Sequence, residues 1–188
     1  YFNSNKSIDV VGANIEVFGW SPTDGWGSES SHTVQFPNSQ KTIESSLKTV
    51  GGFWVLAHPV VMIRKNALVA AGGYSNRFDR AEDLDLWVRL HLKGAKFSNI
   101  ERVLLKYREG QSSLSFDNRV PRYLATAVLI NSVRDGSYPE CDKELNIENL
   151  RYYCSEASLL RVILDFSILL RGVSQSTRLN NLTTLRTV

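Results

Sequence analysis

The chain has 188 residues, a formal net charge of +3, 43% hydrophobic residues and 22% charged residues. This composition is that of an ordinary globular protein, and it excludes a disordered or collagen-like chain. The small net charge and the lack of any run of Lys or Arg argue against nucleic acid as a partner. The length allows one domain with a hydrophobic core, or one domain with a helical extension.

The cysteines and the apolar stretches indicate a compartment. Cys141 and Cys154 lack the spacing of a zinc site and predict no disulfide framework. No stretch approaches the roughly 20 apolar residues that cross a bilayer, and no signal peptide begins the chain. These features favour a reduced, cytoplasmic setting. Because the chain begins with Tyr1 and enters strand-like sequence almost at once, we expect it to be cut from a longer protein.

The N-terminal part predicts a strand, a loop and a short helix. Residues 8–18 are rich in β-branched residues that partly alternate with polar ones, which favours a strand. Residues 19–40 are rich in Gly, Ser, Pro and Asn, and they predict a long surface loop or a loose hairpin. A short helix is expected over residues 43–50, where the following glycines end it.

The most apolar run, residues 53–63, is interrupted by His58 and Pro59. Proline donates no hydrogen bond to a sheet and restricts the residue before it, so His58 is predicted at a bend or at the start of a strand. A histidine in such a place is either a satisfied core residue or a polar group on the floor of a cleft. In a cleft it would bind an acceptor hydroxyl or a phosphate oxygen.

A second short helix is expected over residues 65–71, and Gly72 and Gly73 follow it. Paired glycines at a helix end permit a left-handed backbone. They also permit close approach of another chain segment or of a ligand.

Residues 81–90, with the sequence AEDLDLWVRL, predict a helix with three acids in its first turn. The helix dipole favours carboxylates there, and a pair such as Glu82 and Asp83 suits a general base that faces a cleft. The same acids also occur where they only cap a helix, so the decapeptide alone leaves both interpretations open. The acids do not have the spacing of a calcium-binding loop.

The C-terminal half predicts strand and then helix. Residues 97–107 indicate one or two short strands, followed by Arg108, which would bind a diphosphate or pair with a helix acid. Helices are expected over residues 121–134 and 147–171. Because apolar residues nearly encircle the second helix, residues 147–172 are expected to contact another element, a second copy in a homo-oligomer, or a membrane surface.

Several of these motifs together resemble a known family. They are His58-Pro59, then Gly72-Gly73-Tyr74, then residues 81–90, then residues 105–108. In this order and spacing they resemble the acceptor-side half of a family 2 glycosyltransferase with the GT-A fold, over roughly residues 7–116. The resemblance implies an α/β protein, a partial GT-A (Rossmann-like) fold with a mixed sheet, flanking helices and a helical C-terminal tail. Its catalytic half would span residues 1–117, and a helical extension residues 118–188.

The resemblance implies inverting transfer of a hexose from a nucleotide-sugar to a hydroxyl of a glycan or lipid-linked acceptor. Such a reaction would serve polysaccharide, cell-surface glycan or glycolipid synthesis, in the cytoplasm or at the inner face of the membrane. By position, Asp83 would be the general base and Glu82 would orient the acceptor. Gly72, Gly73, His58 and Arg108 would line the donor and acceptor sites.

The chain also departs from that family. The nucleotide-binding N-terminal half, with the Asp-x-Asp that binds Mg²⁺ or Mn²⁺, is missing, so we expect the metal ligands upstream and this chain alone to be inactive. Gly110 stands where many members have a histidine that helps to bind the metal. The alternative is a non-catalytic acceptor-binding or assembly module that docks a partner through its C-terminal helix.

Overall fold

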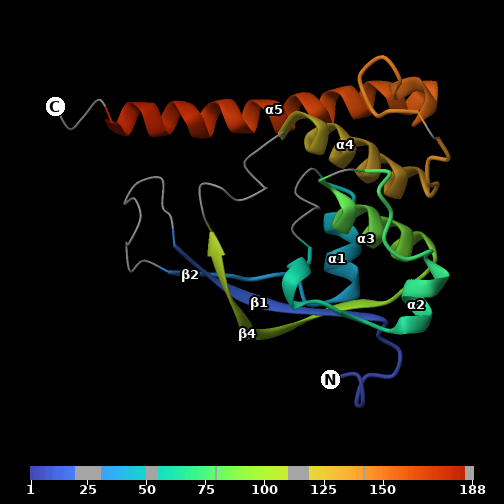
Figure 1. Cartoon of the computed structure of the whole chain (residues 1–188), viewed down its shortest axis with the longest axis vertical. Coiled ribbons are helices and arrows are strands. Elements are labelled where there is room, and N and C mark those ends of the chain that lie inside the picture. The colour runs from blue at the N-terminus through green and yellow to red at the C-terminus, as the bar shows by residue number, and fades with distance from the viewer. Residues whose placement is uncertain (20–30, 50–54, 79, 110–118, 142, 185–188) are drawn as a thin grey trace.

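The computed structural model describes residues 1–19, 31–49, 55–78, 80–109, 119–141 and 143–184. Within these residues a four-stranded sheet and five α-helices form a mixed α/β structure (Figure 1). The expected α/β class is therefore confirmed. Gly110 lies outside the described residues, so the departure noted at that position has no structural counterpart here.

The sheet is built around β1 (Val10–Gly19). β2 (His32–Val34) and β3 (Met62–Ile63) pair antiparallel with its two ends. β4 (Phe97–Glu109) pairs parallel with its whole length, from Val10 opposite Phe97 to Gly19 opposite Glu109. The expected mixed sheet is confirmed. Of the two alternatives for residues 19–40, the loose hairpin is confirmed, because β2 at residues 32–34 pairs antiparallel with β1.

Gly12 shows how closely β1 and its surroundings pack. A Cβ atom at Gly12 would collide with the side-chain oxygen of Asn99 on β4. The amide nitrogen of the Asn99 side chain donates to the backbone oxygens of Pro37 and Val55 at 2.7 and 2.8 Å. A side chain at position 12 would displace these hydrogen bonds, so the strand requires glycine there.

The shorter helices follow the expected positions. α1 (Gln40–Leu47) begins earlier than residue 43, because the Ser39 hydroxyl accepts a hydrogen bond from the Thr42 amide and caps the helix. A short 3₁₀ turn, η2 (His58–Val60), contains the predicted bend at Pro59. α2 (Lys65–Ala70) and α3 (Glu82–Leu92) form as expected.

The last helices are α4 (Arg119–Asp135) and α5 (Glu156–Thr184). The expected start of the last helix at residue 147 is wrong. The side chain of Asn146 accepts the Asn149 amide at 2.9 Å and holds a turn, and a 3₁₀ turn, η3 (Leu150–Tyr152), follows. Local side-chain bonds of this kind compete with helix formation, so α5 begins only after Ser155.

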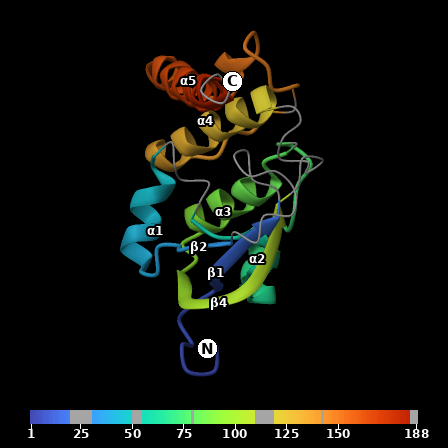
Figure 2. The ribbon, with the colours of Figure 1, turned by 90° about the vertical axis from the view of Figure 1, so that its left-hand side faces the viewer.

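The elements stack in layers, with the sheet first, then α1 and α3, then α4, and α5 outermost (Figure 2). One cluster of buried apolar side chains joins these layers. It includes Val10 of β1, Trp87 of α3, Leu129 of α4 and Phe166 of α5. The helices after residue 118 therefore share the core of the preceding residues, and the boundary between residues 117 and 118 stays a prediction.

Candidate functional site

The first turn of α3 presents the acidic pair. Arg80, just before it, has a left-handed backbone with a φ of 64°, which is uncommon for a residue other than glycine and turns the chain into the helix. Glu82 is exposed, whereas the next acid, Asp83, is half-buried. The helix thus begins with one carboxylate in water and one against the protein.

Asp83 is the less solvated carboxylate of the pair. Burial raises its pKa above the ordinary value of 3.8, although a hydrogen bond from the Leu84 amide to its carboxylate at 2.7 Å opposes the shift. The neighbouring charge of Glu82 also raises the pKa, and that of His58 lowers it. A carboxylate with a raised pKa is a stronger base once it is ionised.

His58 lies at this same place. Its Nε2 and the Tyr74 hydroxyl are hydrogen-bonded at 2.8 Å, and its ring meets the Trp87 indole edge-on with centroids 6.0 Å apart. Burial raises the pKa of Tyr74, and so do the charges of Asp83 and Glu82. The structure therefore brings together His58, Glu82 and Asp83, three of the residues that the sequence predicted for the site.

Tyr74 and Trp87 are members of this cluster that were not predicted as site residues. Tyr74 is 51% exposed, so its ring is accessible to a ligand. The Trp87 side chain is buried, and its Nε1 has no hydrogen-bond partner among the described residues. Its position directly after two glycines is the signal in the sequence that could have identified Tyr74 as a site residue.

Gly72 and Gly73 end α2 with left-handed φ angles of 82° and 70°. The Gly73 amide donates to the Leu68 oxygen and the Gly72 amide to the Val69 oxygen, which is the Schellman arrangement. Apart from each glycine and its two chain neighbours, no heavy atom lies within 4 Å of the positions that Cβ atoms would occupy. The structure thus explains both glycines by backbone conformation, and a close approach to a ligand stays a prediction.

Arg89 of α3 fixes this glycine turn. One of its terminal nitrogens donates to the backbone oxygens of Ala71 and Gly73, at 2.6 Å each. The other terminal nitrogen and Nε donate to one carboxylate oxygen of Asp85, at 2.6 and 3.0 Å. Since Tyr74 follows the turn directly, this contact holds it beside the start of α3.

Asp85 is fully buried, and a partner from the chain after α4 completes its hydrogen bonds. The Tyr138 hydroxyl donates to its second carboxylate oxygen at 2.5 Å. Burial and the bond to Asp85 raise the pKa of Tyr138 well above its usual range. Both carboxylate oxygens of Asp85 thus accept hydrogen bonds, one from Arg89 and one from Tyr138, and this buried arrangement gives Asp85 a structural role.

Arg108 belongs to β4 and not to the elements that carry His58, Tyr74 and Asp83. It lies near the end of β4, opposite Phe18 in the β1–β4 register, and its side chain is exposed. In the described part of the chain no ion pair joins it to Glu82 or Asp83. Its contact with a diphosphate stays a prediction.

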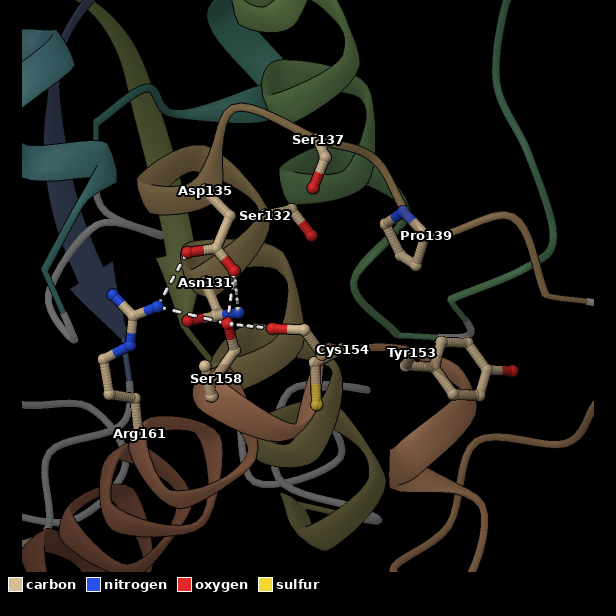
Figure 3. A pocket seen from close by; sticks show the side chains of 11 residues that line it. Asn131, Ser132, Asp135, Ser137, Pro139, Tyr153, Cys154, Ser158 and Arg161 are labelled. Atoms are coloured by element: carbon tan, nitrogen blue, oxygen red, sulfur yellow. Dashed lines mark hydrogen bonds and ion pairs between the residues drawn. The ribbon is translucent and has the colours of Figure 1, made fainter.

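A cavity of about 380 Å³ lies elsewhere, between the end of α4 and the start of α5. Figure 3 shows Asp135 there with Ser158, Arg161 and Asn131 turned toward its carboxylate. These donors lower the pKa of Asp135, the Ser158 hydroxyl most of all. Because the carboxylate already accepts three side-chain donors, the group joins two helices and offers little to a ligand.

Metal binding finds no support among the described residues. Among the described residues no group of three or more His, Cys, Asp or Glu side chains is arranged to bind a metal ion. None of the described helices has the length and apolar character needed to cross a membrane. Comparisons with protein-family models, curated proteins and solved structures find no match to this chain.

Proposed function

We propose that this chain is the acceptor-side part of an inverting glycosyltransferase similar to family 2 enzymes with the GT-A fold. The observation that carries the proposal is the grouping of Asp83, a half-buried carboxylate with a raised pKa, with His58 and Tyr74 at one helix start. His58, Tyr74 and Asp83 come from separate motifs in the sequence, and their grouping in space supports a common site.

In the proposed reaction a hydroxyl of the acceptor hydrogen-bonds to the Asp83 carboxylate. As its oxygen forms a bond to the anomeric carbon, its proton passes to Asp83. The bond from that carbon to the diphosphate breaks, and its electron pair leaves with the nucleotide. The carboxylate needs only to accept this proton, while the positions of the two substrates supply much of the rate.

The neighbours of Asp83 would position the acceptor. The exposed ring of Tyr74 provides a face on which a sugar can pack, and its hydrogen bond to His58 fixes the hydroxyl. Glu82, exposed on the same turn, would accept a second acceptor hydroxyl. Gly72, Gly73 and Arg108 keep their expected places at the donor and acceptor sites in this proposal.

The resemblance also implies Mg²⁺ or Mn²⁺ on the diphosphate of the donor. The described residues do not fit such an ion, since no group of three possible ligands forms among them. We therefore derive no step through a metal, and we place the ligands and most of the nucleotide contacts in the expected upstream half.

A non-catalytic module is the second candidate. It is favoured by one contact, the hydrogen bond from the Leu84 amide to Asp83, because this amide belongs to the first turn of α3 and has no partner within the helix. In that case Asp83 would act through stability, and the C-terminal helix would dock a partner.

Calorimetry distinguishes these two functions. UDP and GDP, each with Mn²⁺, are titrated into this chain and into a chain extended upstream by about 100 residues, the size of one added domain. Binding to the extended chain alone supports the glycosyltransferase. Absence of binding to both chains contradicts it and favours the module.

A further inference from the structure

The outer face of α5 is apolar. Its exposed fractions are 72% for Leu160, 40% for Ile163, 60% for Leu164 and 54% for Ile168. These residues are spaced by three and four positions, so they form one stripe along the helix. We call these four residues the α5 stripe. Exposed helix faces normally carry polar and charged residues, and a row of aliphatic side chains indicates a binding surface.

The opposite face of α5 is already occupied. Val162 and Phe166 are buried in the core, and Asp165 is buried in an ion pair with Arg134 of α4. Figures 1 and 2 show α5 as the outermost layer, with α4 on its inner side. The described residues that cover α5 thus leave the stripe facing outward.

A hydroxyl beside the stripe already has a hydrogen-bond acceptor within the helix. The hydroxyl of Ser167, which falls on the same face, donates to the Ile163 backbone oxygen at 2.8 Å. Because the donor proton of this hydroxyl is already bonded inside the helix, moving this face out of water costs less free energy.

The charges near the stripe become positive toward its C-terminal end. Glu156 is exposed one turn before Leu160, and Arg161 is ion-paired with Asp135, whereas Arg171 is exposed at the far end of the stripe. From residue 166 to the end the sequence has three arginines and no acid, or a charge of +3. Directly before α5, the exposed Tyr152 ring lies under the cations of Lys143 and Arg151. Exposed aliphatic, aromatic and cationic side chains together are typical of contact with a membrane interface.

We propose that the α5 stripe binds the surface of an anionic lipid bilayer, with the helix lying in the plane of the interface. The aliphatic side chains enter the boundary between headgroups and acyl chains, and the exposed Arg171 pairs with acidic headgroups. We choose the bilayer over a second copy because the exposed acid of α5, Glu156, cannot balance the three arginines that follow Asp165, whereas anionic headgroups can. This inference does not depend on sugar transfer.

Co-sedimentation of the full chain with vesicles tests this surface. We expect binding to phosphatidylcholine vesicles that contain about a quarter phosphatidylserine, and at least about tenfold weaker binding to pure phosphatidylcholine. Binding should fall in roughly 1 M NaCl, where charges are screened beyond about 3 Å.

Variants distinguish binding through the stripe from nonspecific binding through other exposed apolar residues. Leu160→Ser combined with Leu164→Ser should weaken vesicle binding about tenfold or more, since both side chains lose their burial in lipid. The matched control is Val69→Ser on α2, which is 67% exposed and should leave binding unchanged. Arg171→Glu should weaken binding to anionic vesicles about fivefold or more. Circular dichroism checks the helical content, and if the double variant unfolds, Arg171→Glu and the salt series carry the test.

Three results would overturn the proposal. The first is no binding of the wild-type chain to anionic vesicles. The second is an equal loss on Val69→Ser. The third is a dimer in light scattering that the double variant abolishes, without vesicle binding, which would assign the stripe to a second copy.

Discussion

Asp83 at the start of α3 and Asp135 at the end of α4 reverse what their helix positions predict. The helix dipole favours a carboxylate at an N-terminus and disfavours one at a C-terminus. The pKa of Asp83 is nevertheless raised by burial, and the pKa of Asp135 is lowered by the Ser158 hydroxyl and Arg161. The local environment therefore outweighs the dipole at both sites.

Magnitudes explain this reversal. A helix terminus is worth roughly 0.3–1 kcal/mol to a charge at the surface, whereas a hydrogen bond to a charged group is worth about 1.5–3 kcal/mol. Asp135 accepts three side-chain donors, and Asp83 accepts only backbone amides of its own helix turn among the described residues. A carboxylate with few donors keeps its capacity to accept a proton from a substrate, and a carboxylate with several becomes a structural link.

The largest expected effect is on catalysis. Asp83→Asn, in a chain extended to include the expected donor-binding half, should lower sugar transfer by about 10²-fold to 10⁴-fold, because the general base is lost. Nucleotide affinity should stay nearly unchanged in calorimetry. The control Asp135→Asn should retain turnover. Near-normal turnover of Asp83→Asn would remove Asp83 as the base.

A smaller effect concerns the free energy of unfolding and compares the hydrogen-bond networks of Asp85 and Asp135. Asp85→Ala should lower the free energy of unfolding by about 3–5 kcal/mol, since it leaves the Arg89 guanidinium and the Tyr138 hydroxyl buried without their partner. Asp135→Ala should cost less, about 1–3 kcal/mol, because water replaces the lost partner of Arg161, which is 47% exposed, and only the neutral Ser158 and Asn131 are left buried without theirs.

Denaturant unfolding measures both losses. The control is Lys106→Ala, whose ion pair with Glu16 is largely exposed and should contribute less than about 1 kcal/mol. Equal losses for Asp85→Ala and Asp135→Ala would contradict the distinction between the two networks.

The smallest expected effect is an opposite dependence on pH. The folded-state pKa of Asp83 is raised above 3.8, so its contribution to stability is fully present below that pH and is lost as the pH rises through the folded pKa. The folded-state pKa of Asp135 is lowered, so its contribution is present above 3.8 and is lost as the pH falls through the folded pKa.

Unfolding of Asp83→Asn and Asp135→Asn between about pH 2 and pH 7 measures this difference. As the pH rises, Asp83→Asn should gain stability relative to the wild type, and Asp135→Asn should lose it. Slopes of the same sign would show that burial does not set the pKa of Asp83.

Local rules predicted much of the fold. The strand over β1, the acidic start of α3 and the glycine end of α2 each depend on neighbours within a few residues. Helix starts were less accurate, because the cap at Ser39 and the turn at Asn146 each use a single hydrogen bond that a hydrophobic pattern does not reveal. The loose hairpin was predicted only as one of two alternatives, because the few residues of β2 give no clear strand pattern until they pair with β1.

The sequence by itself determined the acids at the start of α3, the left-handed glycines and the apolar character of α5, because each follows from side-chain chemistry within one or two turns. Only the tertiary structure decided that His58 meets Tyr74, that Tyr138 reaches Asp85, and which face of α5 is covered by α4. Those contacts join residues on separate elements, and hydrophobic periodicity carries no information about partners across such distances in the chain. A helix that is apolar on all sides presents the same pattern to every partner, so packing alone selected the buried face and left the α5 stripe outside.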